Sequence, residues 1–318
     1  MRIMKCTARG GKEFYGIVDG TRVRPLRGCQ SVEELFGALR KRRPPAGPPI
    51  ALSSVKMLPP TDPNARIFCA GLNYRDHADE LRMPAPKSPI FFTKTSGALS
   101  GANDDIVYPE GVKLLDHELE LALVIGRRIG KDERVTAENL SEFSLGIAIF
   151  NDVSARDVQL STGQWFLGKT YRTFAPTGPV VQTLDAAALE RLYALDMELK
   201  VYDPDGKLHA HKHQAGTTAN MIFRLHELVA CLAQRFDLLP GDVIATGTPK
   251  GVALGKPARL QVRMAEILGI PQGKRTARFI AGEIAHNDRY LRPGDVIEAR
   301  IASPDGVVDL GVQRTRIR

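Results

Sequence analysis

Short apolar segments separated by turns fill the chain from residue 65 onward, and this pattern constrains the fold most. Two related turns, Leu239-Pro-Gly-Asp242 and Leu291-Arg-Pro-Gly-Asp295, lead into such segments at residues 243–246 and 296–301. Helical patterns do not alternate with the strands, as a parallel sheet with crossover helices would require. We therefore expect an α+β fold, with mixed sheets and few helices, rather than a Rossmann-type sheet.

The clearest helical pattern spans residues 218–236, where apolar residues fall on one stripe. The stripe consists of Met221, Ile222, Leu225, Leu228, Val229 and Leu232. Between the two turns, residues 255–290 have the pattern of a partly helical insertion, with Pro257 at its first helical position.

The first 60 residues have the pattern of a smaller, separate unit. A hairpin is expected to turn at Asp19-Gly20, and a capping box at Ser31 and Glu34 begins a short helix through Leu39. Proline-rich stretches at residues 44–49 and 59–60 indicate a connector. The sequence thus predicts an N-terminal α/β domain at residues 1–60 and a catalytic domain at residues 61–318.

Composition narrows the class of protein. The 318 residues are 43% hydrophobic and 25% charged, and no stretch approaches the ~20 apolar residues that span a bilayer. No secretory signal is visible, and the four cysteines form no Cys-x-x-Cys pair. We expect a cytoplasmic protein with reduced thiols and no membrane partner.

The net charge of +8 raises the question of a nucleic-acid partner. The densest basic run, at residues 40–43, is followed at once by two prolines and has no interleaved aromatic residues. A solvated helix end explains it better, so we expect no nucleic acid. A basic nucleic-acid-binding protein on the same fold is the non-enzyme alternative.

An acidic pair before an apolar strand is the strongest functional signal. In LDHELELALVIG, Glu118 and Glu120 are two residues apart, so on a strand they point to the same face. Two carboxylates that close repel each other unless a cation lies between them. Exposed strands also carry Glu-x-Glu without function, which leaves both interpretations open. His117 points to the opposite face and is left out.

A third acid, Asp152, follows the apolar strand at residues 145–150, where a rigid element opens into a loop. Carboxylate ligands without a nearby cysteine select a hard cation, Mg²⁺, Mn²⁺ or Ca²⁺. Arg156 and Gln159 follow on a turn or short helix, where Arg156 could instead neutralise one of the acids.

In the segment GLNYRDHADE, His77 and Glu80 are three residues apart and share a face of a helical turn. A carboxylate that fixes the tautomer of an imidazole makes it a competent general base. A surface pair is the other interpretation. The polar residues 73–80, with Met83-Pro84 soon after, indicate a short mobile turn rather than core.

Residues 163–170, GQWFLGKT, have the spacing of a phosphate-binding P-loop. Three bulky residues crowd this loop, no apolar strand precedes Gly163, and prolines follow too soon for a helix. We therefore expect no nucleotide cofactor, and we expect Lys169 to serve as a cation in the site.

Five ordered motifs resemble the fumarylacetoacetate hydrolase family. They are GLNYRDHADE, LDHELELALVIG, IFNDVSARDVQ, QWFLGKTYRTFAPTGP and LLPGDVIATGTPKGV. The resemblance covers roughly residues 59–252 and resumes at LRPGDVIEARI. It is closest to the bacterial branch with 2-hydroxyhepta-2,4-diene-1,7-dioate isomerase and the acylpyruvate hydrolases. It implies a mixed β-roll of stacked sheets with few helices, and a homodimer.

The resemblance also implies roles for individual residues. The divalent-metal ligands would be Glu118, Glu120 and Asp152. The catalytic residues would be His77 and Glu80, as a base dyad on a lid, and Lys169, which steadies an enolate. The substrate-binding residues would be Arg156, Gln159 and Thr248. The insertion at residues 255–290 departs from shorter members of the family.

The function so implied is divalent-metal-dependent hydrolysis of a C–C bond in an acylpyruvate or fumarylacetoacetate-type 2-oxo acid, through a metal-bound enolate. The alternative is isomerisation of 2-hydroxymuconate-type dienoic acids in aromatic-compound degradation, and a decarboxylase or hydratase would use the same residues. The expected partner is a small anionic 2-oxo or 2-hydroxy acid. His209, His211 and His213 alternate along a strand, and an exposed hairpin explains them better than a metal site.

Overall fold

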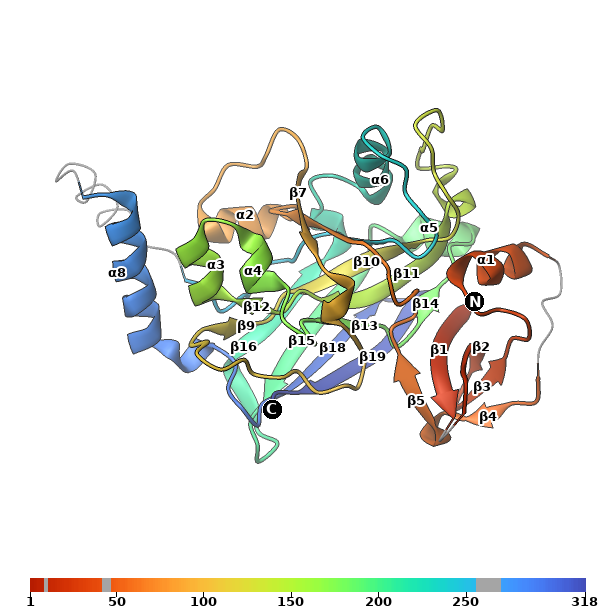
Figure 1. The fold of residues 1–318 in the computed structure, drawn as a ribbon, viewed down its shortest axis with the longest axis horizontal. Coiled ribbons are helices and arrows are strands. Elements are labelled where there is room, and N and C mark those ends of the chain that lie inside the picture. The colour runs from red at the N-terminus through yellow and green to blue at the C-terminus, as the bar shows by residue number, and fades with distance from the viewer. Residues whose placement is uncertain (9–10, 42–46, 256–269) are drawn as a thin grey trace.

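Two packed sheets form the centre of the protein, seen in a computed structural model that describes residues 1–8, 11–41, 47–255 and 270–318 (Figure 1). The larger sheet of the described chain contains β1 (Arg2–Ala8), β2 (Glu13–Asp19), β3 (Arg22–Pro25), β4 (Ile50–Ala51), β5 (Val55–Leu58), β6 (Ile67–Gly71), β7 (Ile90–Lys94), β8 (Leu99–Gly101), β10 (Leu119–Ile125), β11 (Ser144–Asn151), β13 (Ala175–Thr177), β14 (Val181–Gln182) and β17 (Val243–Ala245). The second sheet contains β15 (Asp196–Tyr202), β16 (Leu208–Thr217), β18 (Val296–Ala302) and β19 (Asp309–Arg316). A short ribbon pairs β9 (Leu115–Asp116) with β12 (Ser154–Ala155).

Helices lie around these sheets (Figure 1). The α-helices are α1 (Val32–Arg40), α2 (Arg75–Leu81), α3 (Arg156–Thr162), α4 (Trp165–Lys169), α5 (Ala186–Arg191), α6 (Leu225–Ala233) and α8 (Gln272–Ala285). The 3₁₀ turns are η1 (Leu52–Ser54), η2 (Ser96–Ala98), η3 (Leu140–Glu142), η4 (Thr218–Asn220) and η5 (Asn287–Arg289).

The central strands β10 and β11 are buried along their whole length because both faces are covered. They pair antiparallel, with Leu119 opposite Asn151. Strand β17 joins the other side of β10 antiparallel, and β6 pairs with β17 in parallel. Most strand pairs of the described chain are antiparallel, β17–β6 and β13–β8 are parallel, and helices are few, so the expected α+β fold with mixed sheets is confirmed.

The local predictions in the N-terminal part are confirmed. Strands β2 and β3 form the hairpin, with Asp19 opposite Arg22 and Gly20 at φ 54°. The Ser31 hydroxyl accepts the N–H of Glu34 at 3.2 Å, and the Glu34 carboxylate accepts the N–H of Ser31 at 3.3 Å. This reciprocal pair caps α1.

Residues 1–58 join the larger sheet through pairing of β1 with β14. Some of their buried side chains share a cluster with the central strands, where Ile3 and Tyr15 join Val124 and Leu145. The domain boundary at residue 60 stays a prediction. The insertion contains α8, which stands at the edge of the molecule in Figure 1, whereas its predicted start at Pro257 lies outside the described residues.

The predicted helix over residues 218–236 is wrong in its bounds. The chain makes the 3₁₀ turn η4, continues extended, and begins α6 only at Leu225. Met221 forms a bridge with Tyr74, and the backbone oxygen of Asn73 accepts the N–H of Ile222 at 2.8 Å. These long-range contacts hold the segment extended despite its helical periodicity. In the described residues no helix is both long and apolar enough to cross a membrane.

Candidate active site

The register of β10 and β11 brings the three predicted acids together. The ladder continues beyond Leu119, where the N–H of Asp152 donates to the backbone oxygen of Glu118 at 2.8 Å. One ligand oxygen from each of Glu118, Glu120 and Asp152 lies within 4.8 Å of the others, and all three side chains are buried. It is the only such group found among the described residues. The predicted convergence of these acids is therefore observed.

Two buried lysines neutralise part of this charge. The Lys169 ammonium at the end of α4 donates to Glu118 Oε2 and Asp152 Oδ2, both at 2.6 Å. Lys94 at the end of β7 pairs with the other oxygen of Asp152 and donates to the backbone oxygen of Val153 at 3.1 Å. Burial lowers the pKa of Lys169, but the charges of Asp152 and Glu118 outweigh this effect and raise its pKa. For Lys94 burial prevails, and its pKa is lowered.

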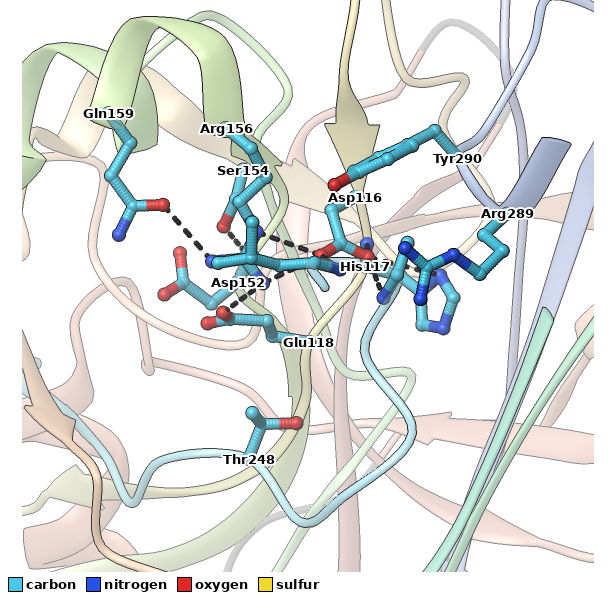
Figure 2. Close-up of polar contacts among 12 residues, drawn as sticks. Asp116, His117, Glu118, Asp152, Ser154, Arg156, Gln159, Thr248, Arg289 and Tyr290 are labelled. Atoms are coloured by element: carbon cyan, nitrogen blue, oxygen red, sulfur yellow. Dashed lines mark hydrogen bonds and ion pairs between the residues drawn. The ribbon is translucent and has the colours of Figure 1, made fainter. Parts of the chain in front are cut away.

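Arg156 pairs with Oε1 of Glu118, whereas Lys169 pairs with Oε2; Figure 2 shows Arg156 between Glu118 and Asp116. Its Nε and Nη2 atoms contact Asp116 Oδ2 at 2.8 and 2.7 Å, and Nη1 donates to Gln159 Oε1 at 3.0 Å. Nη2 also pairs with Glu118. With only 3% of Arg156 exposed, the guanidinium is occupied by protein groups. The geometry thus matches the neutralising role, and the expected substrate-binding role of Arg156 and Gln159 stays a prediction.

Asp116 anchors Arg156 from a fully buried position. Its carboxylate accepts the backbone N–H groups of His117 and Ala253 at 2.8 Å and of Leu254 at 3.1 Å. Asp116 therefore joins the strand that carries the acids to the segment that follows Thr248. Figure 2 shows the ring of His117 directed away from Glu118 and Asp152, as the strand periodicity predicts.

Glu120 differs from the other acids because no ion pair reaches it within the described chain. Its Oε2 accepts the N–H of Gly247 at 2.8 Å. Burial and the neighbouring charges of Asp152 and Glu118 raise the pKa of Glu120 well above its usual value. Burial acts in the same direction on Glu118, but Arg156 and Lys169 outweigh it and hold its pKa well below the usual range. One carboxylate of the group thus lacks a cation.

The predicted dyad of His77 and Glu80 is formed on α2. His77 Nδ1 lies 3.2 Å from Glu80 Oε2, and the Glu80 carboxylate also accepts the N–H of Gly251 at 3.1 Å. His77 is 7% exposed and therefore lies inside, whereas Arg75 and Asp79 on the same helix are exposed. The predicted mobility of this turn stays a prediction. The charge of His77 contributes to the low pKa of Glu118, which places the imidazole within electrostatic reach of the acids.

Thr248 is buried below Glu118 in Figure 2. Its hydroxyl donates to the backbone oxygen of Leu119 at 3.0 Å and accepts from Gln214 Nε2 at 2.8 Å. These bonds fix the loop after β17 beside β10. A contact of this hydroxyl with substrate stays a prediction.

The segment with P-loop spacing is helical where a phosphate-binding loop would be open. Gly163 ends α3 at φ 67°, and α4 directs Lys169 into the acidic group. His209, His211 and His213 lie along β16 in the predicted hairpin, where His209 Nε2 lies 3.3 Å from Asp295.

Sequence reasoning missed Lys94 and Asp116. Asp116, Glu118 and Glu120 alternate, so the period of two could have included the first acid. Lys94 ends the apolar run Ile90–Lys94, and a lysine there signals a buried partner. That partner, Asp152, is 58 residues away and could not be named from the pattern.

Comparison with known proteins identifies the family. The sequence profile described as fumarylacetoacetate (FAA) hydrolase C-terminal matches residues 66–318. The chain belongs to the fumarylacetoacetate hydrolase family. The resemblance drawn from the five motifs is thereby confirmed, and proteins of this family are enzymes.

Three relatives within the fumarylacetoacetate hydrolase family carry different names. A mitochondrial oxaloacetate tautomerase of Rattus norvegicus is 37% identical over 208 residues, which are 65% of this chain and 63% of the relative. The solved 2-hydroxyhepta-2,4-diene-1,7-dioate isomerase of Mycobacterium marinum matches with TM-score 0.69 and 27% identity, covering 100% of this chain and 98% of that one. A fumarylacetoacetate hydrolase of Exiguobacterium antarcticum gives TM-score 0.71 and 26% identity, covering 100% and 99%.

Proposed function

We propose that this protein is a divalent-metal-dependent enzyme that acts on 2-oxo acids by moving a proton at the carbon beside the keto group. The observation that carries the proposal is the buried group of Glu118, Glu120 and Asp152, bridged by Lys169 and within electrostatic reach of His77. Clusters of buried charged groups are expected in enzymes where charge develops during a reaction.

The donor set fits a hard divalent cation. Glu118, Glu120 and Asp152 would hold it, because carboxylate oxygens are the ligands that Mg²⁺, Mn²⁺ and Ca²⁺ prefer. The carboxylate of Glu120 has no ion-pair partner among the described residues, and its pKa is raised by burial first and then by the like charges of Asp152 and Glu118. A cation bound there would polarise the keto group of a 2-oxo acid as a Lewis acid.

The remaining residues supply charge and proton transfer. Lys169 presents a positive ammonium, which would stabilise negative charge on an enolate oxygen. Glu80 fixes one ring nitrogen of His77, so the other is free to take or give a proton if α2 opens to admit substrate. Asp116 holds Arg156 against Glu118 and so fixes the carboxylate orientation.

The first candidate reaction is hydrolysis of the C–C bond of an acylpyruvate-type acid. His77 would take a proton from the water that attacks the distal carbonyl, and the C–C bond between that carbonyl and the carbon beside the keto group would then break. The enolate that leaves would be stabilised beside Lys169 and would receive the proton from His77 at that carbon. The second candidate is keto–enol tautomerisation of a 2-oxo acid, in which His77 moves the proton directly. The 37% identity to a protein named oxaloacetate tautomerase favours this second reaction.

A substrate panel tests the proposal. We expect Mg²⁺-dependent loss of absorbance with an acylpyruvate or with the enol of oxaloacetate, measured beside a 2-hydroxy-dienoic acid. Glu120→Gln should abolish turnover, whereas Glu110→Gln, at an exposed acid, should retain it. Full turnover in the presence of a chelator, or in Glu120→Gln, would refute the metal-dependent mechanism.

A further inference from the structure

One face of β7 changes from buried charge to exposed apolar surface. Lys94, Phe92 and Ile90 alternate and therefore share a face of the strand. The Lys94 side chain is fully buried against Asp152, Phe92 is half-buried, and Ile90 is 41% exposed. The strand thus leads outward from the acidic group along apolar side chains.

Helix α4 repeats this gradient. Trp165 and Lys169 are four residues apart, so they lie on one face of the helix, one turn from each other. Lys169 is buried at the acids, whereas Trp165 is 38% exposed. Two elements distant in sequence therefore have a cation at the inner end and an apolar side chain at the outer end.

Trp165, at the outer end of α4, contacts β7 at Phe92. The ring centres of Phe92 and Trp165 are 5.3 Å apart, and the rings meet edge to face. The Lys169 ammonium lies 5.0 Å from the ring centre of Phe92. Gly71 leaves room for this arrangement, because a Cβ there would come within 2.6 Å of the Trp165 ring and 3.8 Å of an Ile90 methyl. We call Ile90, Phe92 and Trp165 the apolar strip.

We propose that the apolar strip is the subsite for the distal part of the substrate, so that an alkyl or aryl group there strengthens the binding of a 2-oxo acid, whereas a second carboxylate brings no such gain. The proposal rests on the proposed function, in which the anionic head group lies at Lys169 and the three acids. A chain extending outward from that point would run along Phe92 toward Ile90 and Trp165. Small-molecule sites commonly combine such apolar walls with a few convergent charged groups.

The competing occupant of the strip is a second copy of the chain, because exposed aromatic side chains also occur at protein interfaces. The strip continues directly from the two buried lysines, Lys94 and Lys169, and this favours a substrate as its occupant. An interface would not require the same gradient from charge to apolar surface on both β7 and α4. Oligomeric state is therefore measured with every variant.

Trp165 is the only tryptophan of the chain, so its fluorescence reports on the strip directly. Three probes share one head group: pyruvate, 4-methyl-2-oxopentanoate and oxaloacetate, each titrated with Mg²⁺ present. We expect 4-methyl-2-oxopentanoate to change the Trp165 emission and to bind about tenfold more tightly than pyruvate. Each fully buried methylene strengthens binding roughly fourfold, and the additional carbons of this probe would be only about half buried on the strip. Oxaloacetate should bind without this gain.

Variants measured by calorimetry assign the effect to the strip. Trp165→Ala should lose most of the tenfold preference, and Trp165→Phe should recover part of it. Phe166→Ala is the matched control, because Phe166 is also 38% exposed but is the adjacent residue on α4. The same preference in Trp165→Ala as in wild type, or a change of oligomeric state without a change of affinity, would overturn the assignment.

Oxalate separates this inference from the proposed function. Mg²⁺-dependent oxalate binding, together with equal affinities for pyruvate and 4-methyl-2-oxopentanoate, would refute the subsite and leave the proposed function standing. Absence of Mg²⁺-dependent oxalate binding would refute both. Tight oxalate binding with the alkyl preference lost in Trp165→Ala would support both.

Discussion

Replacing Asp116 by asparagine should destabilise the protein strongly and weaken its metal binding. The buried carboxylate receives two contacts from Arg156, at 2.8 and 2.7 Å, and three backbone N–H groups. Asparagine keeps the size but replaces one acceptor oxygen by an amide donor, which would face other donors. Removing one partner of a buried ion pair typically costs about 3–5 kcal/mol.

The same change should act on the acids through Arg156. Without Asp116, the guanidinium keeps one ion-pair partner among the described residues, Glu118, and competes with a metal for that carboxylate. We therefore expect urea unfolding to report a free energy about 3–5 kcal/mol lower and calorimetry to report weaker Mg²⁺ binding. Asp196→Asn, at an exposed position, is the control. A loss below about 1 kcal/mol with unchanged Mg²⁺ affinity would refute the positioning role.

Three further predictions concern the acids, the base and the lysine. The pKa of Glu120 is raised in the folded state, so the metal-free protein should lose stability as the pH rises from the usual glutamate pKa of 4.5 through the raised pKa of Glu120. Melting curves of Glu120→Gln should lack this decline. His77→Gln should lower turnover by ~10²–10⁴-fold while oxalate binding persists, and Glu80→Gln should cause a loss of the same kind that is not additive with it; near wild-type turnover would remove the dyad from the mechanism. ATP should not raise the melting temperature, because Lys169 is predicted to serve the acidic site and not a phosphate loop. A ligand present at 100 times its Kd would stabilise the protein by ~2.7 kcal/mol, so ATP binding would be visible in the melting curve. An ATP effect that is lost in Lys169→Ala would contradict the assignment of that lysine.

The parts of the fold that follow from local chemistry could be predicted from the sequence. The strands β10 and β11 are continuous apolar runs, and the capping box at Ser31 identifies its helix within one residue of the observed end. The start of α6 could not be predicted, because contacts from Asn73 and Tyr74 hold residues 221–223 extended. Those contacts join segments about 150 residues apart.

The same distinction holds for the candidate site. The shared direction of Glu118 and Glu120 follows from the two-residue period of a strand, and the position of Asp152 follows from the end of an apolar run. Both are local patterns of a few residues, so the group of acids could be predicted. Lys94 reaches Asp152 only because the fold brings the end of β7, the last strand of the larger sheet, to the residue that follows β11, and no local pattern encodes this contact. The side-chain partners of the residues predicted to bind substrate likewise depend on tertiary packing.

The central claim is that three buried acids bind one divalent ion, and Mg²⁺ titration of the metal-free protein by calorimetry tests it most directly. We expect saturable binding of one ion per chain in wild type, its loss in Glu120→Gln, and wild-type behaviour in the exposed control Glu110→Gln. Mg²⁺ should raise the melting temperature of the variants that bind it and leave that of Glu120→Gln unchanged. No saturable binding in wild type, or equal affinity in wild type and Glu120→Gln, would contradict the claim.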